Sequence, residues 1–141
     1  MFGHHGKLDT GWLASVGFFE GFGPAELDAV ASLGERVEVG AGSELIDQGR
    51  VGDVCYVIVS GTANVYIRGE YVTSVGQGTM VGEMALVEHR PRNATVVAET
   101  DMVLVAFGTG DFRRLLAKSP NTNERVMSLL RDRLQANRER A

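Results

Sequence analysis

The feature that most constrains the fold is a series of short runs rich in valine, isoleucine, tyrosine and threonine, separated by turns that contain glycine. Such runs are typical of β-strands, and glycine between them is typical of tight turns. The runs occupy residues 36–39, 44–47, 54–60, 63–67, 71–75, 94–98 and 102–107. Their short, regular spacing predicts an antiparallel β-barrel of the jelly-roll type, a double-stranded β-helix, over residues 35–108. Within it, Arg68-Gly69-Glu70 is expected to form a tight hairpin.

Helical patterns flank this β region on both sides. Residues 12–34 predict N-terminal helices, with Pro24 in place to start a helix and Gly34 in place to end it. Residues 109–139 predict two C-terminal helices, because Phe112, Leu115 and Leu116 share one helical face and the chain then reaches Pro120. The pair Asn121 and Glu124 fits the N-terminal cap of the second helix. The expected fold is therefore mainly β with flanking helices.

The length of 141 residues allows one domain. We expect an N-terminal tail over residues 1–11 and a single domain over residues 12–139. The longest apolar run, residues 54–59, is too short to cross a bilayer, and the N-terminus lacks an apolar stretch of signal-peptide length. A cytoplasmic protein with no membrane partner is the expectation.

The charges of the chain are unevenly distributed. Residues 1–112 carry 6 basic and 15 acidic side chains, whereas residues 113–141 carry 8 basic and 3 acidic ones. An acidic body is poorly suited to contact a nucleic-acid backbone, so no direct DNA binding is expected from this chain. An anionic ligand would need a local cluster of cations.

One loop, residues 76–94, combines two glutamates, two arginines and three glycines. The Arg92 guanidinium offers forked donors for a phosphate, and the Glu83 carboxylate offers acceptors for hydroxyl groups. Gly82 allows close approach of the backbone, and Met84-Ala85-Leu86 can form a helical turn whose free N–H groups face an anion. This combination suits a sugar phosphate.

The sequences Gly82-Glu83-Met84-Ala85-Leu86 and Pro91-Arg92-Asn93-Ala94-Thr95 resemble the phosphate-binding cassette of the cyclic nucleotide-binding domain family, of the cAMP receptor protein and protein kinase A regulatory subunit type. The resemblance covers about residues 12–139. It implies that Arg92 holds the cyclic phosphate and Glu83 the ribose 2′-hydroxyl. The ligand-binding set is completed by Gly82, Met84, Ala85 and the backbone of Asn93 and Ala94.

Asn93 departs from the Ala, Ser or Thr usual in the family after this arginine. Its amide can donate a hydrogen bond to a base or crowd the phosphate, so the choice between cAMP and cGMP rests on it, with cAMP expected. The end of the last helix resembles the stretch from which bacterial regulators of this family reach the base. By that match Asn137 and Arg138 are candidate base-binding residues.

The family resemblance predicts a small-molecule sensor that signals through movement of the C-terminal helices, acts on an unknown protein effector and forms a homodimer through the helix of residues 122–139. Two alternatives stay open: a protein-interaction module without ligand, and the effector domain of a transcription regulator whose DNA-binding part is absent from this chain. The simplest alternative for Glu83 and Arg92 is a surface ion pair, and Arg90 is expected to be a solvated flank. No cofactor, metal site or catalytic residue is expected, because the three histidines do not cluster on a strand and no nucleophile with a base can be assembled.

Overall fold

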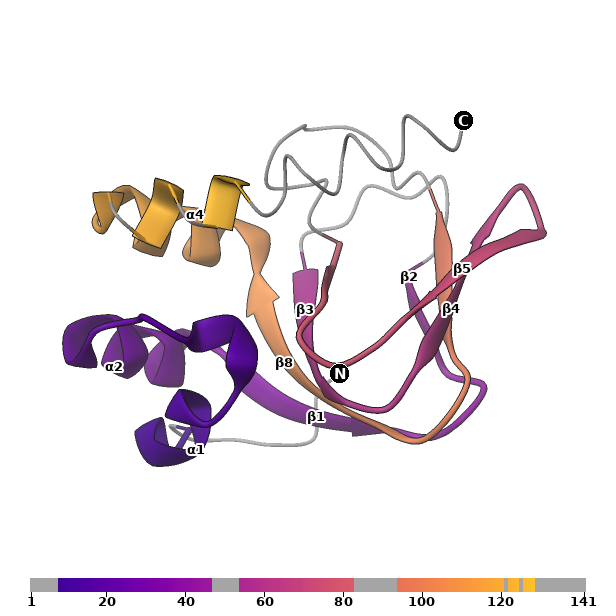
Figure 1. Ribbon diagram of the computed structural model, residues 1–141, viewed down its shortest axis with the longest axis horizontal. Coiled ribbons are helices and arrows are strands. Elements are labelled where there is room, and N and C mark those ends of the chain that lie inside the picture. Colours follow the sequence, from indigo (N-terminus) through magenta and orange to yellow (C-terminus); the bar gives the residue numbers. More distant parts are fainter. Residues whose placement is uncertain (1–7, 47–53, 83–93, 121, 125, 129–141) are drawn as a thin grey trace.

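The computed structural model describes residues 8–46, 54–82, 94–120, 122–124 and 126–128, which form a helical layer and two β-sheets (Figure 1). In chain order the elements are α1 (Thr10–Ala14), the 3-10 helix η1 (Gly17–Phe19), α2 (Pro24–Leu33), β1 (Glu35–Val39), β2 (Glu44–Ile46), β3 (Val54–Ser60), β4 (Ala63–Ile67), β5 (Glu70–Val75), β6 (Met80–Val81), β7 (Thr95–Ala98), β8 (Met102–Gly108) and α4 (Thr109–Ala117). Residues 120, 122–124 and 126–128 are also helical, and we call them the last helix.

The strands are antiparallel and form two four-stranded sheets in the described part of the chain. The first sheet has the order β1-β8-β3-β6, and the second has the order β2-β7-β4-β5. The mainly β, jelly-roll fold with flanking helices is confirmed. Among the described strands, however, the two sheets face each other without closing into one barrel.

The alternation of side chains along the strands separates two apolar cores. On β8, Val105 and Phe107 point to the helical layer, whereas Leu104 and Ala106 point to the second sheet. On β3, Val57 and Ile58 divide in the same way. The first sheet is therefore covered on both faces, by helices on one side and by the second sheet on the other.

Aromatic side chains hold the helices to the first sheet. Phe107 on β8 stacks on Phe112 of α4 with ring centroids 5.0 Å apart, and it meets Phe19 of η1 edge-on at 6.2 Å. All three rings are almost fully buried. Because one β8 residue contacts both groups of helices, the N-terminal helices and α4 share a single core.

Local signals explain where the N-terminal helices begin and end. The Asp9 carboxylate accepts a hydrogen bond from Gly11 N–H at 2.9 Å, so α1 begins at Thr10. Pro24 is the first residue of α2, and the Gly23 N–H donates to the Glu26 carboxylate at 2.8 Å. A Cβ on Gly34 would lie 2.7 Å from the Phe107 ring, so the residue that follows α2 has to be small. The predicted start at Pro24 and end at Gly34 are confirmed.

Several features differ from the sequence-based expectation. The first helix, α1, begins at Thr10, inside the tail predicted for residues 1–11, because Asp9 caps it there. β6 was not predicted, because a two-residue strand is too short to show an alternating pattern. The last helix is already helical at residue 120, so it begins before the predicted cap at Asn121, which lies outside the described residues. None of the described helices combines the length and the apolar character needed to cross a membrane.

Candidate functional site

The segment of residues 82–94 joins the two sheets. It leaves the first sheet after β6 and enters the second at β7. Of the predicted site residues, the structure describes Gly82 and Ala94, the two ends of this segment. The others lie outside the described residues: Glu83, Met84, Ala85, Arg92, Asn93, Asn137 and Arg138. The structure therefore describes the strands at the two ends of the segment, β6 and β7.

Gly82 sets the direction in which the chain leaves the first sheet. Its φ is +83°, in the left-handed region, where a side chain costs roughly 1–2 kcal/mol. The preceding residue, Val81, is 1% exposed and pairs with Tyr56 of β3. Val81 is therefore fixed in the core, and the residue after it turns the backbone sharply.

Backbone hydrogen bonds fix β6 against β3 although β6 has only two residues. Ile58 N–H donates to the Thr79 carbonyl at 2.8 Å, and Gly78 N–H donates to the Ile58 carbonyl at 2.9 Å. Gly78 has a φ of +85°, so the turn before β6 uses the left-handed backbone conformation that favours glycine. These two bonds hold Gly78 and Thr79 against β3, just before β6 and the start of the segment.

The other end of the segment is held inside the second sheet. Ala94 is half-buried and precedes β7, which lies between β4 and β2. Val96 pairs with Val65 on one side and with Ile46 on the other. A strand with two neighbours is a rigid anchor, so both ends of the segment are set by the sheets.

The core between the two sheets contains both completely buried and half-buried side chains. Ile58, Ala63 and Leu104 are completely buried. Val54, Tyr56 and Val65, on β3 and β4, pack on the same core but are only half-buried. We call these three residues the apolar wall. Tyr56 pairs with Val81, next to Gly82, and Val65 pairs with Val96, close to Ala94.

The described residues place no basic side chain at the apolar wall. Their basic side chains are Arg36, Arg68, Arg113, Arg114 and Lys118. Arg36 lies over the Trp12 ring at 5.1 Å, Arg68 is at the tip of the β4–β5 hairpin, and the other three belong to or follow α4. A cation for an anion bound beside the apolar wall would therefore have to come from outside the described residues, where Arg92 of the segment lies.

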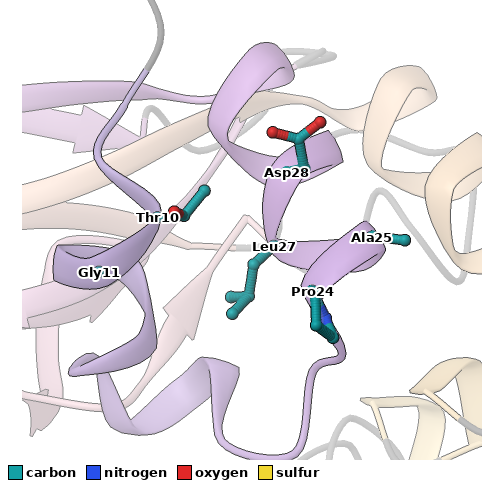
Figure 2. Close-up of a pocket in the computed structure, with 6 residues that line it drawn as sticks. All are labelled: Thr10, Gly11, Pro24, Ala25, Leu27 and Asp28. Atoms are coloured by element: carbon teal, nitrogen blue, oxygen red, sulfur yellow. The ribbon is translucent and has the colours of Figure 1, made fainter.

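A hollow lies in the helical layer, between α1 and α2. It is lined by Thr10, Gly11, Pro24, Ala25, Leu27 and Asp28 (Figure 2). Figure 2 shows the Leu27 side chain extending between the two helices. The one charged lining residue is a carboxylate, so this hollow does not fit an anionic ligand. Within the described ranges no three His, Cys, Asp or Glu side chains group as metal ligands would.

The sequence reasoning did not find the apolar wall. The period-2 pattern of β3 and β4 indicates which side chains point inward, but it does not show which of them lie near Gly82 and Ala94. That information comes from the pairing of Tyr56 with Val81 and of Val65 with Val96, contacts between residues distant in sequence. The local signal in the sequence was Gly82, whose positive φ in the structure is one that favours glycine.

Comparison with known proteins places this geometry in context. The family model described as Cyclic nucleotide-binding domain matches residues 36–119, a span that includes the whole segment of residues 82–94. A cyclic nucleotide-binding-like protein from Brucella abortus is 34% identical with a TM-score of 0.62, over 77% of this chain and 97% of that chain.

Two further solved structures share the fold. The catabolite activator protein of Thermus thermophilus is 28% identical with a TM-score of 0.72, over 85% of this chain and 59% of that chain. The cAMP-bound PfPKA-R structure has a TM-score of 0.77 at 23% identity, over 93% of this chain and 44% of that one. This chain thus spans about half the length of these two larger proteins.

Proposed function

Because the chain belongs to the cyclic nucleotide-binding domain family, we propose that it is a regulatory domain that binds a cyclic nucleotide, with cAMP favoured over cGMP. One observation carries the proposal. The family match includes the segment with Glu83 and Arg92, and both described ends of that segment lie beside the half-buried apolar wall. An anion site on the segment and an apolar surface next to it fit the two halves of a nucleotide.

The phosphate half of the ligand is assigned to the segment. Arg92 holds the cyclic phosphate through its forked N–H donors, and Glu83 accepts from the ribose 2′-hydroxyl. Gly82, Met84 and Ala85, with the backbone of Asn93 and Ala94, complete the cradle. The left-handed Gly82 supports this role, because it lets the backbone turn where the cradle begins.

The base half of the ligand is assigned to the apolar wall and to two polar groups. Val54, Tyr56 and Val65 offer partly exposed apolar surface on which a purine can be buried. Asn93 is next to the phosphate arginine, where its amide selects between adenine and guanine by hydrogen bonding. Asn137 and Arg138 are proposed to reach the base from the end of the last helix.

Signalling is assigned to the helices after β8. The last helix is docked on the helical layer through Val126, which is 1% exposed, and through Thr122. A ligand that favours one position of this helix shifts the equilibrium by its difference in affinity for the two positions. The helix of residues 122–139 is then the output, through a second copy of the chain or through a protein effector. In this proposal the domain binds and signals without catalysis.

Ligand-dependent thermal unfolding tests the proposal. At a hundredfold excess over Kd, a ligand that binds the folded state adds about 2.7 kcal/mol, which for a domain of this size raises Tm by roughly 5–10 °C. We expect cAMP to raise Tm in a saturable way, cGMP to act more weakly, and linear AMP to have no effect. Equal shifts with AMP would show a nucleotide site that does not recognise the cyclic phosphate, and no shift with any nucleotide for ligand-free protein would favour the interaction module instead.

A further inference from the structure

Glu26 connects two parts of the helical layer that are far apart in sequence. One carboxylate oxygen, Oε1, accepts from Gly23 N–H at 2.8 Å and so caps the start of α2. The other oxygen, Oε2, accepts a short hydrogen bond from the Thr122 hydroxyl of the last helix. One carboxylate therefore serves two helices whose residues are separated by 96 positions.

The surroundings of this contact make it stronger than an ordinary surface hydrogen bond. Thr122 is 8% exposed, and among the described residues it is the one polar residue that is buried. Glu26 is partly buried. The hydrogen bond from Thr122, followed by that from the Gly23 amide, lowers the pKa of the Glu26 carboxyl below its ordinary value. The nearby Ser119 side chain, just before the last helix, lowers this pKa further. Bonds to a charged acceptor with restricted access to water are worth more than neutral exposed ones.

Thr122 and Val126 lie on the same face of the last helix, because residues four apart are one turn apart. Val126 enters the apolar core formed with α2 and α4, and Thr122 reaches Glu26. The docked position thus has one apolar and one polar anchor. Apolar contact tolerates sliding, whereas a hydrogen bond to a fixed carboxylate defines one position.

We propose that Glu26 and Thr122 form a latch that transmits the position of the last helix to the N-terminal helices. When Thr122 leaves, the Glu26 carboxylate loses one partner, turns toward water and caps Gly23 less well, so the start of α2 loosens. The movement that opens the latch rests on the proposed function, whereas the hydrogen bond between Glu26 and Thr122 is present in the structure. Its signature is a response at Gly23 to a change at Thr122.

The first test uses the full chain without ligand, followed by 15N NMR and amide hydrogen exchange. Thr122→Val removes the hydroxyl and keeps the shape, Thr122→Ser keeps the hydroxyl, and Glu26→Gln removes the charged acceptor. We expect Thr122→Val and Glu26→Gln each to lower the exchange protection of Gly23 and Met127 by roughly tenfold, and Thr122→Ser to change it by less than about twofold. The double variant should lose no more than either single variant. Unchanged protection of Gly23 in Thr122→Val, or additive losses in the double variant, would overturn the latch.

The second test adds cAMP. In the unmodified chain, we expect the amide signals of Gly82, Ala94, Gly23 and Thr122 to shift together with saturation. In Thr122→Val, Gly82 and Ala94 should still shift, while Gly23 should no longer respond. A response of Gly23 that survives the substitution, or its absence in the unmodified chain when Gly82 and Ala94 do shift, would contradict the latch. If Gly82 and Ala94 do not shift, the proposed function fails and the first test alone decides on the latch.

Discussion

At the scale of single residues, Gly61, in the turn between β3 and β4, lies against the turn between β7 and β8. A Cβ on this residue would lie 2.4 Å from the Asp101 carbonyl oxygen and 2.8 Å from the Met102 side chain. Its φ of +93° also disfavours any side chain. The neighbouring bonds from Thr62 N–H to the Thr100 hydroxyl and from Glu99 N–H to the Thr62 carbonyl hold the two turns together, so neither can withdraw.

Two glycine variants separate backbone strain from this steric clash. Gly42 has nearly the same φ, +91°, but no atom lies within 4 Å of its Cβ position. Gly42→Ala should therefore cost about 1–2 kcal/mol in the free energy of unfolding, and Gly61→Ala should cost about 2 kcal/mol more because something must move. Urea unfolding followed by circular dichroism measures both. Equal losses would show that the turn near Asp101 yields freely.

The charge of Glu26 makes a pH-dependent contribution to stability. Its folded-state pKa is lowered, so the stabilisation is present above the pKa of the unfolded chain and is lost as the pH falls through the folded-state value. The stability difference between the unmodified protein and Glu26→Gln should therefore be largest near pH 7 and shrink steadily below about pH 4. Urea midpoints at several pH values measure this difference. Glu99→Gln, a change on an exposed turn, is the control, and a Glu26→Gln difference that stays constant with pH would refute the assignment.

At the scale of elements, the β4–β5 hairpin shows how a local sequence sets a register. Ile67 pairs with Glu70, so Arg68 and Gly69 are the two loop residues. Their φ values, +54° and +79°, are both positive, as a type I′ turn requires. The tight hairpin predicted from Arg68-Gly69-Glu70 is confirmed, although arginine is an unusual residue at the first position.

Replacing Arg68 by a residue that favours positive φ should stabilise the hairpin. Arg68→Asn creates the Asn-Gly pair preferred in type I′ turns, and we expect a gain of about 0.5–1 kcal/mol in the free energy of unfolding. Gly69→Ala, where no atom lies within 4 Å of the Cβ position, should cost roughly 1–2 kcal/mol through backbone strain alone. Chemical denaturation measures both variants. A loss of stability in Arg68→Asn would show that the arginine side chain contributes more than the backbone preference.

The sequence predicted the elements whose signals are local. The strands of residues 54–60 and 63–67 were placed correctly, because alternating β-branched residues and glycine turns mark them. β6 could not be predicted, since its two residues become a strand only through pairing with Tyr56 and Val57. The Glu26–Thr122 contact was likewise invisible, because no local pattern relates residues 96 positions apart.

At the scale of the whole molecule, the first sheet lies between the helical layer and the second sheet (Figure 1). The segment of residues 82–94 and the helices after β8 are both attached to this first sheet. The segment of residues 82–94 starts from β6 on this sheet. β8 of the same sheet continues into α4, which leads to the last helix. A change at the segment and a change in the helices can therefore be coupled through β3 and β8, which pair along most of their length.

For the candidate site, the sequence predicted the functional groups, and the structure describes the strands that hold the two ends of the segment. Glu83 and Arg92, which lie outside the described residues, were predicted because a carboxylate and a guanidinium in a glycine-led loop stand out in one stretch of chain. The apolar wall of Val54, Tyr56 and Val65 could not be found in this way, since its members come from two strands, and only tertiary pairing brings Tyr56 next to Val81 and Val65 next to Val96.

The central claim is that Arg92 anchors a cyclic phosphate, and calorimetric titration with cAMP tests it most directly. The unmodified chain should bind cAMP saturably, and Arg92→Ala should weaken binding at least about a hundredfold, since a charge-assisted bidentate contact is lost. Arg90→Ala, two residues away on the same segment, is the matched control and should bind nearly as the unmodified chain does. Retained affinity in Arg92→Ala, or equal losses in both variants, would contradict the account.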